Sequence, residues 1–379
     1  MLPSQRQLFD IPDDVAYFNC GYMGPLMKSA IEAGIAGLKR KSTPWTLSPN
    51  DFFTESQSAR KLFANLINAD AEDIAIIPAA SYGLAVAAKN IPVKKGKTVL
   101  ILKDQFPSNF YCWQELCNET GGRIVTIEPP MDHDWTKVIL EKINENTALA
   151  ALPHNLWTDG GLLDLERIGK RLREVGAKLV LDVTQSLGAM PLDVSKIKPD
   201  FLVAAAYKWL LGPYSVGFMY VAPEHQNGIP IEHSWLNRHG SEDFSALVDY
   251  QDDFQPGAVR YDMGQRANFA LMPVAVAALQ QISEWGVEEI YKSLTEKTSN
   301  IAKAAEELGF KSLPLAHRAG HFLGLSHANG ISPTLLADLA EEKIFVSARG
   351  KSLRITPHLY NNTHDAERLI NALAKAVGK

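Results

Sequence analysis

The chain has 379 residues, of which 46% are hydrophobic and 21% are charged, and its net charge at pH 7 is -5. These values are ordinary for a globular enzyme and exclude a strongly basic surface for nucleic acid. No apolar run approaches the ~20 residues of a membrane span, and the first residues lack the basic and apolar regions of a signal peptide. We therefore expect a cytoplasmic protein without membrane or nucleic-acid partners, long enough for two domains.

Cysteine and histidine spacing predicts neither a disulfide framework nor a metal site. Cys20, Cys112 and Cys117 are too few and too irregularly spaced for either. The three histidines within residues 224–257 also lack the spacing of metal ligands. We expect no bound metal.

Strands and helices alternate through the first two-thirds of the chain. The predicted strands share short apolar runs and lie at 74–78, 98–102, 122–127, 147–152, 179–181 and 201–206. The predicted helices share longer periodic patterns and lie at 27–40, 53–68, 135–145 and 165–175. This order is typical of an α/β fold with a mainly parallel sheet. Residues 42–53 and 224–257 lack periodicity, and we expect both segments to be loops over a site.

After residue 260 the predicted elements are shorter and mixed in type. Helices are expected at 268–285, 287–308, 334–343 and 363–376, and strands at 322–325, 345–347 and 353–356. This pattern is typical of a small α+β domain. We expect an N-terminal segment (1–16) that packs on the small domain, a large domain (17–260) and a small C-terminal domain (261–379).

A carboxylate and a lysine follow two of the predicted strands. Strand 179–181 ends at Asp182, and strand 201–206 leads into Lys208, which is 26 residues farther along. Because the carboxyl ends of parallel strands meet at one edge of a sheet, both side chains are expected in the same crevice. Pyridoxal phosphate (PLP) needs this pair, since a lysine forms its Schiff base and a carboxylate keeps its pyridine nitrogen protonated.

The surrounding motif strengthens that interpretation. With Gln185 three residues after Asp182 and a glycine-containing loop at 212–217 after Lys208, the segment resembles the class V aminotransferase family of fold-type I PLP enzymes. The resemblance extends over about residues 15–377. It implies a large cofactor-binding domain with a mainly parallel, seven-stranded sheet and a small C-terminal α+β domain. It also implies that Asp182 binds the pyridine nitrogen, that Gln185 binds the ring hydroxyl, and that Lys208 is catalytic through an aldimine.

Five further positions are implied to bind the cofactor. Ala80 and Ser81 begin an apolar helix and match the Ala-Thr of the family's phosphate-binding Gly-Ala-Thr; a helix N-terminus attracts anions. A plain N-cap role for Ser81 would give the same sequence. Phe106 fits the ring that stacks on the pyridine. Trp157 replaces a polar residue near the ring hydroxyl, and Tyr207 stands where the family often has His.

The resemblance also implies a homodimer and a substrate site. Gln265 replaces a threonine that reaches the phosphate of the neighbouring subunit's cofactor in relatives, which implies shared sites in an isologous dimer. Asn19 and Tyr22 lie in a turn at the mouth of the site. Arg354 matches an arginine that binds the substrate carboxylate, for which its planar fork is well suited. Arg349 is the competing candidate.

The implied function is a PLP-dependent enzyme acting on a small-molecule substrate, an amino acid or related amine, with transamination first. The alternatives are a kynureninase-like lyase, towards which Phe106 and Tyr207 lean, and an isopenicillin N epimerase-like epimerase. A cysteine desulfurase is disfavoured, because relatives supply a reactive thiolate from the C-terminal third and no cysteine follows Cys117. A non-catalytic module on the same fold would require Lys208 to be incidental.

Overall fold

A seven-stranded sheet forms the centre of the computed structural model, which describes residues 1–378. Its strand order is β2-β8-β7-β6-β5-β3-β4. Its members are β2 (Ile74–Ile77), β3 (Thr98–Leu102), β4 (Arg123–Ile127), β5 (Thr147–Pro153), β6 (Lys178–Asp182), β7 (Phe201–Ala205) and β8 (Gly217–Val221). Neighbours from β7 to β4 are parallel, and β8 is antiparallel to both of its neighbours. The predicted α/β fold with a mainly parallel sheet is confirmed.

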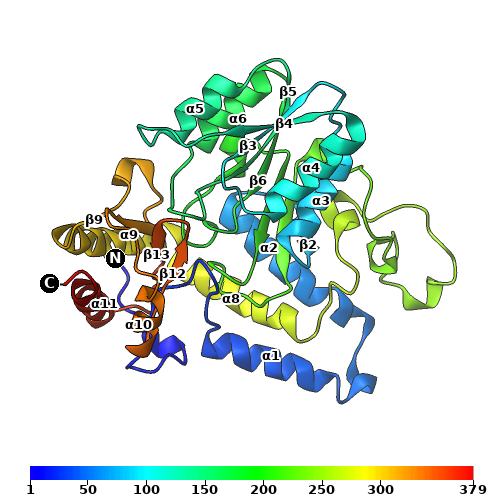
Figure 1. The fold of residues 1–379 in the computed structure, drawn as a ribbon. Coiled ribbons are helices and arrows are strands. Elements are labelled where there is room, and N and C mark those ends of the chain that lie inside the picture. Colours follow the sequence, from blue (N-terminus) through cyan, green and yellow to red (C-terminus); the bar gives the residue numbers. More distant parts are fainter. Residues whose placement is uncertain (379) are drawn as a thin grey trace.

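Helices cover both faces of this sheet (Figure 1). In chain order they are α1 (Lys28–Arg40), α2 (Thr54–Ile67), α3 (Ala80–Asn90), α4 (Ser108–Thr120), α5 (Trp135–Lys142), α6 (Leu165–Glu174), α7 (Val194–Ile197) and α8 (Leu271–Trp285). Leu179 and Leu181 pack in a core with residues of α6 and α8, whereas Val180 packs in a second core with residues of α3 and α4. Because successive strand residues point to opposite faces, a strand buried on both faces contains a continuous apolar run, as residues 179–181 of β6 show.

The C-terminal part contains a separate sheet of four strands in the order β12-β13-β10-β9, with all pairs antiparallel. Its elements are α9 (Val287–Glu307), β9 (Phe310–Lys311), β10 (Leu323–His327), α10 (Leu335–Glu341), β11 (Ile344–Phe345), β12 (Ser347–Arg349), β13 (Ser352–Ile355) and α11 (Thr363–Ala376). Thus the predicted small α+β region after the large sheet is present.

The N-terminal segment packs against this C-terminal part. Strand β1 (Ala16–Tyr17) pairs in parallel with β11. The backbone N–H of Gln5 donates to the carbonyl of Leu359 at 2.8 Å, and Arg6 forms an ion pair with Asp365 at 3.0 Å. Helix α8, in contrast, packs against α1 and α2. The division at residues 16 and 260 stays a prediction.

Strand β8 was not predicted from the sequence. It begins at Gly217, the last residue of the loop predicted at 212–217, and no element was predicted for residues 218–221. The strand returns antiparallel beside β7, which a short connection allows, whereas a parallel neighbour needs a crossover of a dozen residues or more. The turn that carries Lys208 is therefore held between two paired strands.

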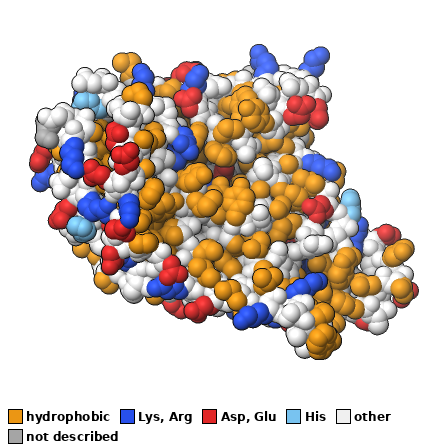
Figure 2. Space-filling view, turned by 60° about the horizontal axis from the view of Figure 1, so that its bottom comes forward, with side chains coloured by type: hydrophobic (Ala, Val, Ile, Leu, Met, Phe, Trp, Pro, Cys, Tyr) orange, Lys and Arg blue, Asp and Glu red, His pale blue; other side chains and the backbone are white. Residues whose placement is uncertain are grey.

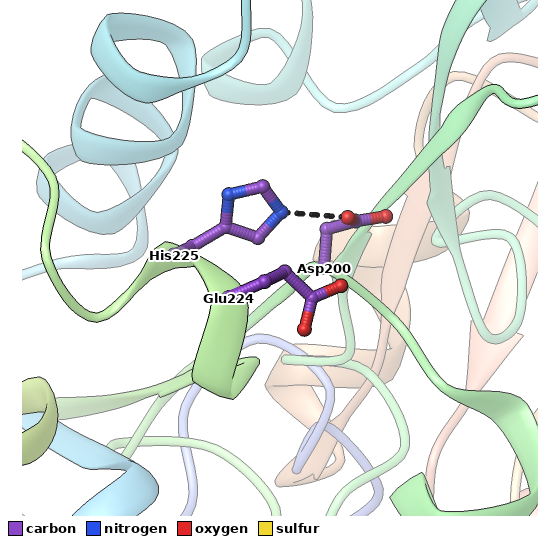
Figure 3. Close-up of side chains that lie close together, drawn as sticks. All are labelled: Asp200, Glu224 and His225. Carbon is purple, nitrogen blue, oxygen red and sulfur yellow. Dashed lines mark hydrogen bonds and ion pairs between the residues drawn. The ribbon is translucent and has the colours of Figure 1, made fainter.

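Asp200 fixes the opposite end of the sheet (Figure 3). One carboxylate oxygen accepts hydrogen bonds from Lys178 Nζ and His225 Nε2, both at 2.7 Å, and the other accepts from the Leu179 N–H at 2.8 Å. Burial opposes the charged form, but bonds from His225 and Lys178 outweigh it and lower the pKa of Asp200. Glu224, which is exposed, places a potential metal ligand within 4.8 Å of those of Asp200 and His225. The Lys178 ammonium already binds the same oxygen and would repel a cation there, so we interpret the cluster as a structural contact rather than a metal site.

Within residues 1–378, no helix combines the length and the apolar character needed to cross a membrane.

Candidate active site

A cavity of about 300 Å³ opens at the carboxyl ends of β5, β6 and β7. Eight of the residues singled out from the sequence line it: Ala80, Ser81, Phe106, Trp157, Asp182, Gln185, Tyr207 and Lys208. We call this cavity the Lys208 pocket. Its position agrees with the general rule that open α/β sheets bind ligands at the carboxyl ends of their strands.

Lys208 lies on a tight turn whose backbone is held on two sides. The Tyr207 carbonyl accepts a hydrogen bond from the Gly24 N–H at 2.8 Å. A Cβ at Gly24 would lie 2.3 Å from the Lys208 carbonyl oxygen, and one at Gly188 would lie 2.5 Å from the carbonyl oxygen of Trp209. Only glycine fits at such distances, so these two close approaches fix where the lysine leaves the backbone.

The Lys208 ammonium is in an environment that favours the neutral amine. Its side chain is 6% exposed, and burial is the main reason that its pKa falls to about 8. Asp182 opposes this shift, whereas Arg354 and Arg349 add to it by repulsion. A neutral amine is the nucleophilic and proton-accepting form, so burial prepares Lys208 for covalent and base chemistry near neutral pH.

Asp182 and Gln185 form the wall beneath Lys208. Asp182 accepts a hydrogen bond from the Thr184 N–H at 3.1 Å, and burial raises its pKa above the usual value. Gln185 donates from Nε2 to the Gly21 carbonyl at 3.0 Å and accepts at Oε1 from Trp209 Nε1 at 3.2 Å. These bonds fix the orientation of the Gln185 amide.

Aromatic rings form the other walls. Phe106 and Trp157 meet edge to face with centroids 5.4 Å apart, and Trp157 Nε1 donates to the Asp104 carbonyl at 2.7 Å. Lys208 Nζ lies 5.4 Å from the centroid of Phe106 and 5.5 Å from that of Tyr207. A flat heteroaromatic ligand next to Lys208 would thus contact ring surfaces on this side of the pocket.

The N-terminus of α3 meets the pocket at Ala80 and Ser81. The residue before the helix is Ala79, and no side chain caps the helix, so Ser81 does not act as an N-cap. The first N–H groups of a helix have no partner within it, and the helix dipole adds partial positive charge. This end of the pocket is therefore suited to a phosphate group.

Asn155, which we did not single out from the sequence, also lines the pocket. It lies two residues after the end of β5, it is fully buried, and its Oδ1 has no hydrogen-bond partner among residues 1–378. A buried, unpaired acceptor is costly unless a ligand donates to it. Its place after a buried strand, as for Asp182, was a signal in the sequence that we did not use. An anion-binding helix end, a buried lysine–aspartate pair, aromatic walls and this free acceptor together fit PLP.

Arg354 lies near the pocket without lining it. Its guanidinium is 1% exposed and donates to the Ser347 hydroxyl from Nε at 3.0 Å and from Nη2 at 2.8 Å, and to the Trp157 carbonyl from Nη1 at 2.8 Å. Asn19 accepts a hydrogen bond from the same hydroxyl at 2.8 Å, so it supports the arginine indirectly. Tyr22 is exposed and does not line the pocket either.

Gln265 lies elsewhere, in a second cavity that it shares with Phe52, Trp235 and residues 267–270. Neither residues 42–53 nor residues 224–257 contribute to the Lys208 pocket of their own chain. The expectation that these segments lie over this pocket is therefore wrong. Instead Phe52 packs edge to face against Phe244, with centroids 5.2 Å apart, because aromatic side chains in both segments bury one another.

Comparison with known proteins shows which family the chain belongs to. The sequence model of class V aminotransferases matches residues 48–368. The chain belongs to the class V aminotransferase family. A protein of Bacillus subtilis (strain 168) named as an uncharacterized aminotransferase is 27% identical, with 98% of both chains covered. A kynureninase of Shouchella clausii is 25% identical over 97% of this chain and 90% of its own length. Other relatives are named cysteine desulfurase and isopenicillin N epimerase.

A solved structure has the same fold over nearly its whole length. It is a mutant of the cystine C–S lyase C-DES with glycine covalently linked to the PLP cofactor. Its TM-score is 0.86 at 20% identity, and the match covers 98% of this chain and 99% of that one. This class V chain is a PLP-dependent enzyme of fold type I.

Proposed function

We propose that this class V enzyme is an aminotransferase that removes the amino group of a small amino acid or related amine. The observation that carries the proposal is Lys208, a buried lysine with a pKa of about 8 that lines a ligand-sized pocket together with Asp182. Bound PLP supplies an acceptor for the electrons released when a bond at the substrate Cα breaks. Lys208 would attach the cofactor and, once substrate displaces it, move the Cα proton.

The surrounding residues bind and orient. Asp182 would hold the proton on the cofactor's ring nitrogen, and the α3 N-terminus at Ala80 and Ser81 would hold its phosphate, with Tyr207 beside it. Gln185 and Asn155 are the polar groups available to the ring hydroxyl. Phe106 and Trp157 would exclude water from the edge of the cofactor's ring. Arg354 would bind the substrate carboxylate with its unused N–H groups, supported through Ser347 by Asn19, while Tyr22 lies toward solvent.

A cysteine desulfurase remains disfavoured. No cysteine lines the Lys208 pocket in the described chain. Cys20 is buried and donates from Sγ to the Lys208 carbonyl at 3.7 Å, and burial raises the pKa of its thiol far above the usual value. Burial likewise raises the pKa of Cys112 to about 12. None of these thiols is prepared to be the thiolate that such a reaction requires.

A C–C lyase or an epimerase is the second candidate, supported by the kynureninase relative that matches 97% of this chain. The experiment mixes holoenzyme with single amino acids in the absence of a keto acid and measures the mass of the released cofactor. An aminotransferase converts one equivalent of cofactor to its amino form and retains the substrate's nitrogen on it. Lys208→Ala is the control, which must abolish conversion. Release of a side-chain fragment, or inversion at Cα without cofactor conversion, would refute transamination.

We also propose a homodimer. Figure 2 shows hydrophobic side chains spread over the face that lies at the bottom of Figure 1. On this side α1 exposes Ile35 and Leu38, the latter at 63%, and Trp45 after it is 79% exposed. Such a face is typical of an interface between subunits. Light scattering is expected to give twice the mass of the chain; an active monomer would contradict the proposal. A cytoplasmic location stays a prediction.

A further inference from the structure

The hairpin of β12 and β13 carries two arginines on one face. The register pairs Ser347 with Arg354 and Arg349 with Ser352. Residues two apart on a strand point to the same side, so Arg349 shares the face of Ser347 and hence of Arg354. Both arginines approach the same ring, with guanidinium carbons 5.5 Å (Arg349) and 5.8 Å (Arg354) from the centroid of Trp157, which lines the Lys208 pocket.

Neither guanidinium has an anionic partner. Arg354 is buried and bonds only to hydroxyl and carbonyl oxygens. Arg349 is half-buried, and its one hydrogen bond is to the carbonyl of its neighbour Ala348 at 2.7 Å. Within residues 1–378, no Asp or Glu lies within ion-pair distance of either arginine.

The two charges also oppose each other. Arg354 has its pKa lowered to about 10, mainly by burial and further by repulsion from Arg349, and both repel the Lys208 ammonium. A buried, unpaired charge is destabilising, and two adjacent like charges are more so. One monocarboxylic substrate neutralises only one of them. A ligand with two anionic groups neutralises both.

We propose that the substrate is a short amino acid with an acidic side chain, whose α-carboxylate binds Arg354 and whose side-chain acid binds Arg349. This inference rests on the proposed function for the α-carboxylate and adds the substrate class. Arg349 is suited to the second role because nearly all its N–H groups are unused and it is only half-buried. The Trp157 ring, which both guanidinium groups approach, would then contact the carbon chain between the two acid groups.

The test compares acids with their isosteric amides, aspartate with asparagine and glutamate with glutamine, because each pair differs in charge and hardly in shape. We expect kcat/KM of the wild type to favour one acid by about 10- to 100-fold, the scale of a hydrogen bond between charged groups. Arg349→Gln is expected to bring the acid-to-amide ratio close to one, and Arg349→Lys to restore part of it. Arg171→Gln, at an exposed arginine of α6 paired with Glu174, is the matched control and leaves the ratio unchanged.

A second measurement does not depend on turnover. Calorimetry with the holoenzyme compares succinate and maleate with butyrate, which has a single carboxylate. We expect tighter binding of the diacids in the wild type and a loss of that difference in Arg349→Gln. Diacid selectivity without amino transfer would refute the proposed function but not the acidic subsite. Amino transfer with equal use of acids and amides, or an equal loss for both in Arg349→Gln, would overturn the acidic subsite alone.

Discussion

Covalent capture of the cofactor by the apoprotein is expected to depend on pH with a midpoint near 8. Only the neutral amine of Lys208 reacts, and the pKa of about 8 leaves about 9% of it neutral at pH 7, against about 0.03% for a lysine at the ordinary value of 10.5. Burial therefore gives Lys208 a reactivity advantage of about 300-fold at this pH. The advantage shrinks as pH rises above 8, because ordinary lysines then become neutral as well.

The mutation Asp182→Asn tests the sign of the charge interaction. Asp182 favours the charged form of Lys208, so its replacement lowers the lysine pKa further and increases the neutral fraction at pH 7. Since the wild type already has about 9% neutral amine, the initial capture rate can rise by no more than about 11-fold. We expect faster capture at pH 7 and little change at pH 9.5.

Apoprotein is mixed with PLP at pH 6 to 10, and borohydride stops the reaction at short times. Peptide mass spectrometry then measures the label at Lys208 relative to the exposed Lys196, and this ratio cancels changes in the reagent's own ionisation. A midpoint at 10 or above for Lys208 would refute the argument from burial. Slower capture by Asp182→Asn at pH 7 would show that the carboxylate acts in another way.

Three further predictions concern stability. The buried His358 has its pKa lowered to about 3, mainly by desolvation, so it stays neutral in the folded protein while the unfolded chain gains a proton below pH 6.5. Lowering the pH from 7 to 5.5 therefore reduces the free energy of urea unfolding, and we expect this reduction to be about 1.2 kcal/mol smaller in His358→Phe than in the wild type. An equal reduction in both proteins would contradict this. Asp262→Asn leaves Arg60 and Arg266 buried without their shared carboxylate, and a loss of about 3–5 kcal/mol is expected in the same assay. Asp200→Asn removes the carboxylate that binds Lys178, His225 and the Leu179 N–H at the far end of the sheet. The free energy of unfolding is expected to fall by about 1–3 kcal/mol, with cofactor binding measured by calorimetry unchanged.

The core of the candidate site could be predicted because it depends on local pattern and on one topological rule. An apolar run that ends at Asp182 and another that ends shortly before Lys208 identify two strands. Because the carboxyl ends of parallel strands lie at one edge of the sheet, the two residues are predicted to lie close together. The same reasoning places Ala80 and Ser81, since a helix that follows a strand begins at that edge. Asn155 obeys the same rule but has no motif of its own, so it was found only through its buried, unpaired oxygen.

Other features depend on contacts that no local pattern records. Gln265 lies in a cavity next to Phe52, against which residues 224–257 pack. This packing could not be predicted, because aromatic residues without a periodic pattern do not indicate which residues they contact. Strand β8 was missed because it begins at the last residue of the predicted loop at 212–217, and no element was predicted for residues 218–221. For Arg354, the strand was predicted correctly, but its neutral hydrogen-bond partners come from Trp157 and Ser347, the first of which is 197 residues away in the chain.

Residues 18–21 connect the two parts of the site. The Thr356 N–H donates to the Phe18 carbonyl at 2.8 Å, the Gly21 N–H donates to the Thr356 hydroxyl at 3.0 Å, and Gln185 donates to the Gly21 carbonyl at 3.0 Å. This chain of bonds joins the strand that carries Arg354 to the wall of the Lys208 pocket. A substrate acid that draws Arg354 forward would pull on the same segment that orients Gln185. In the proposed function, substrate recognition and cofactor alignment therefore share one short stretch of backbone, which directly follows β1, the strand that pairs with β11 rather than with the large sheet.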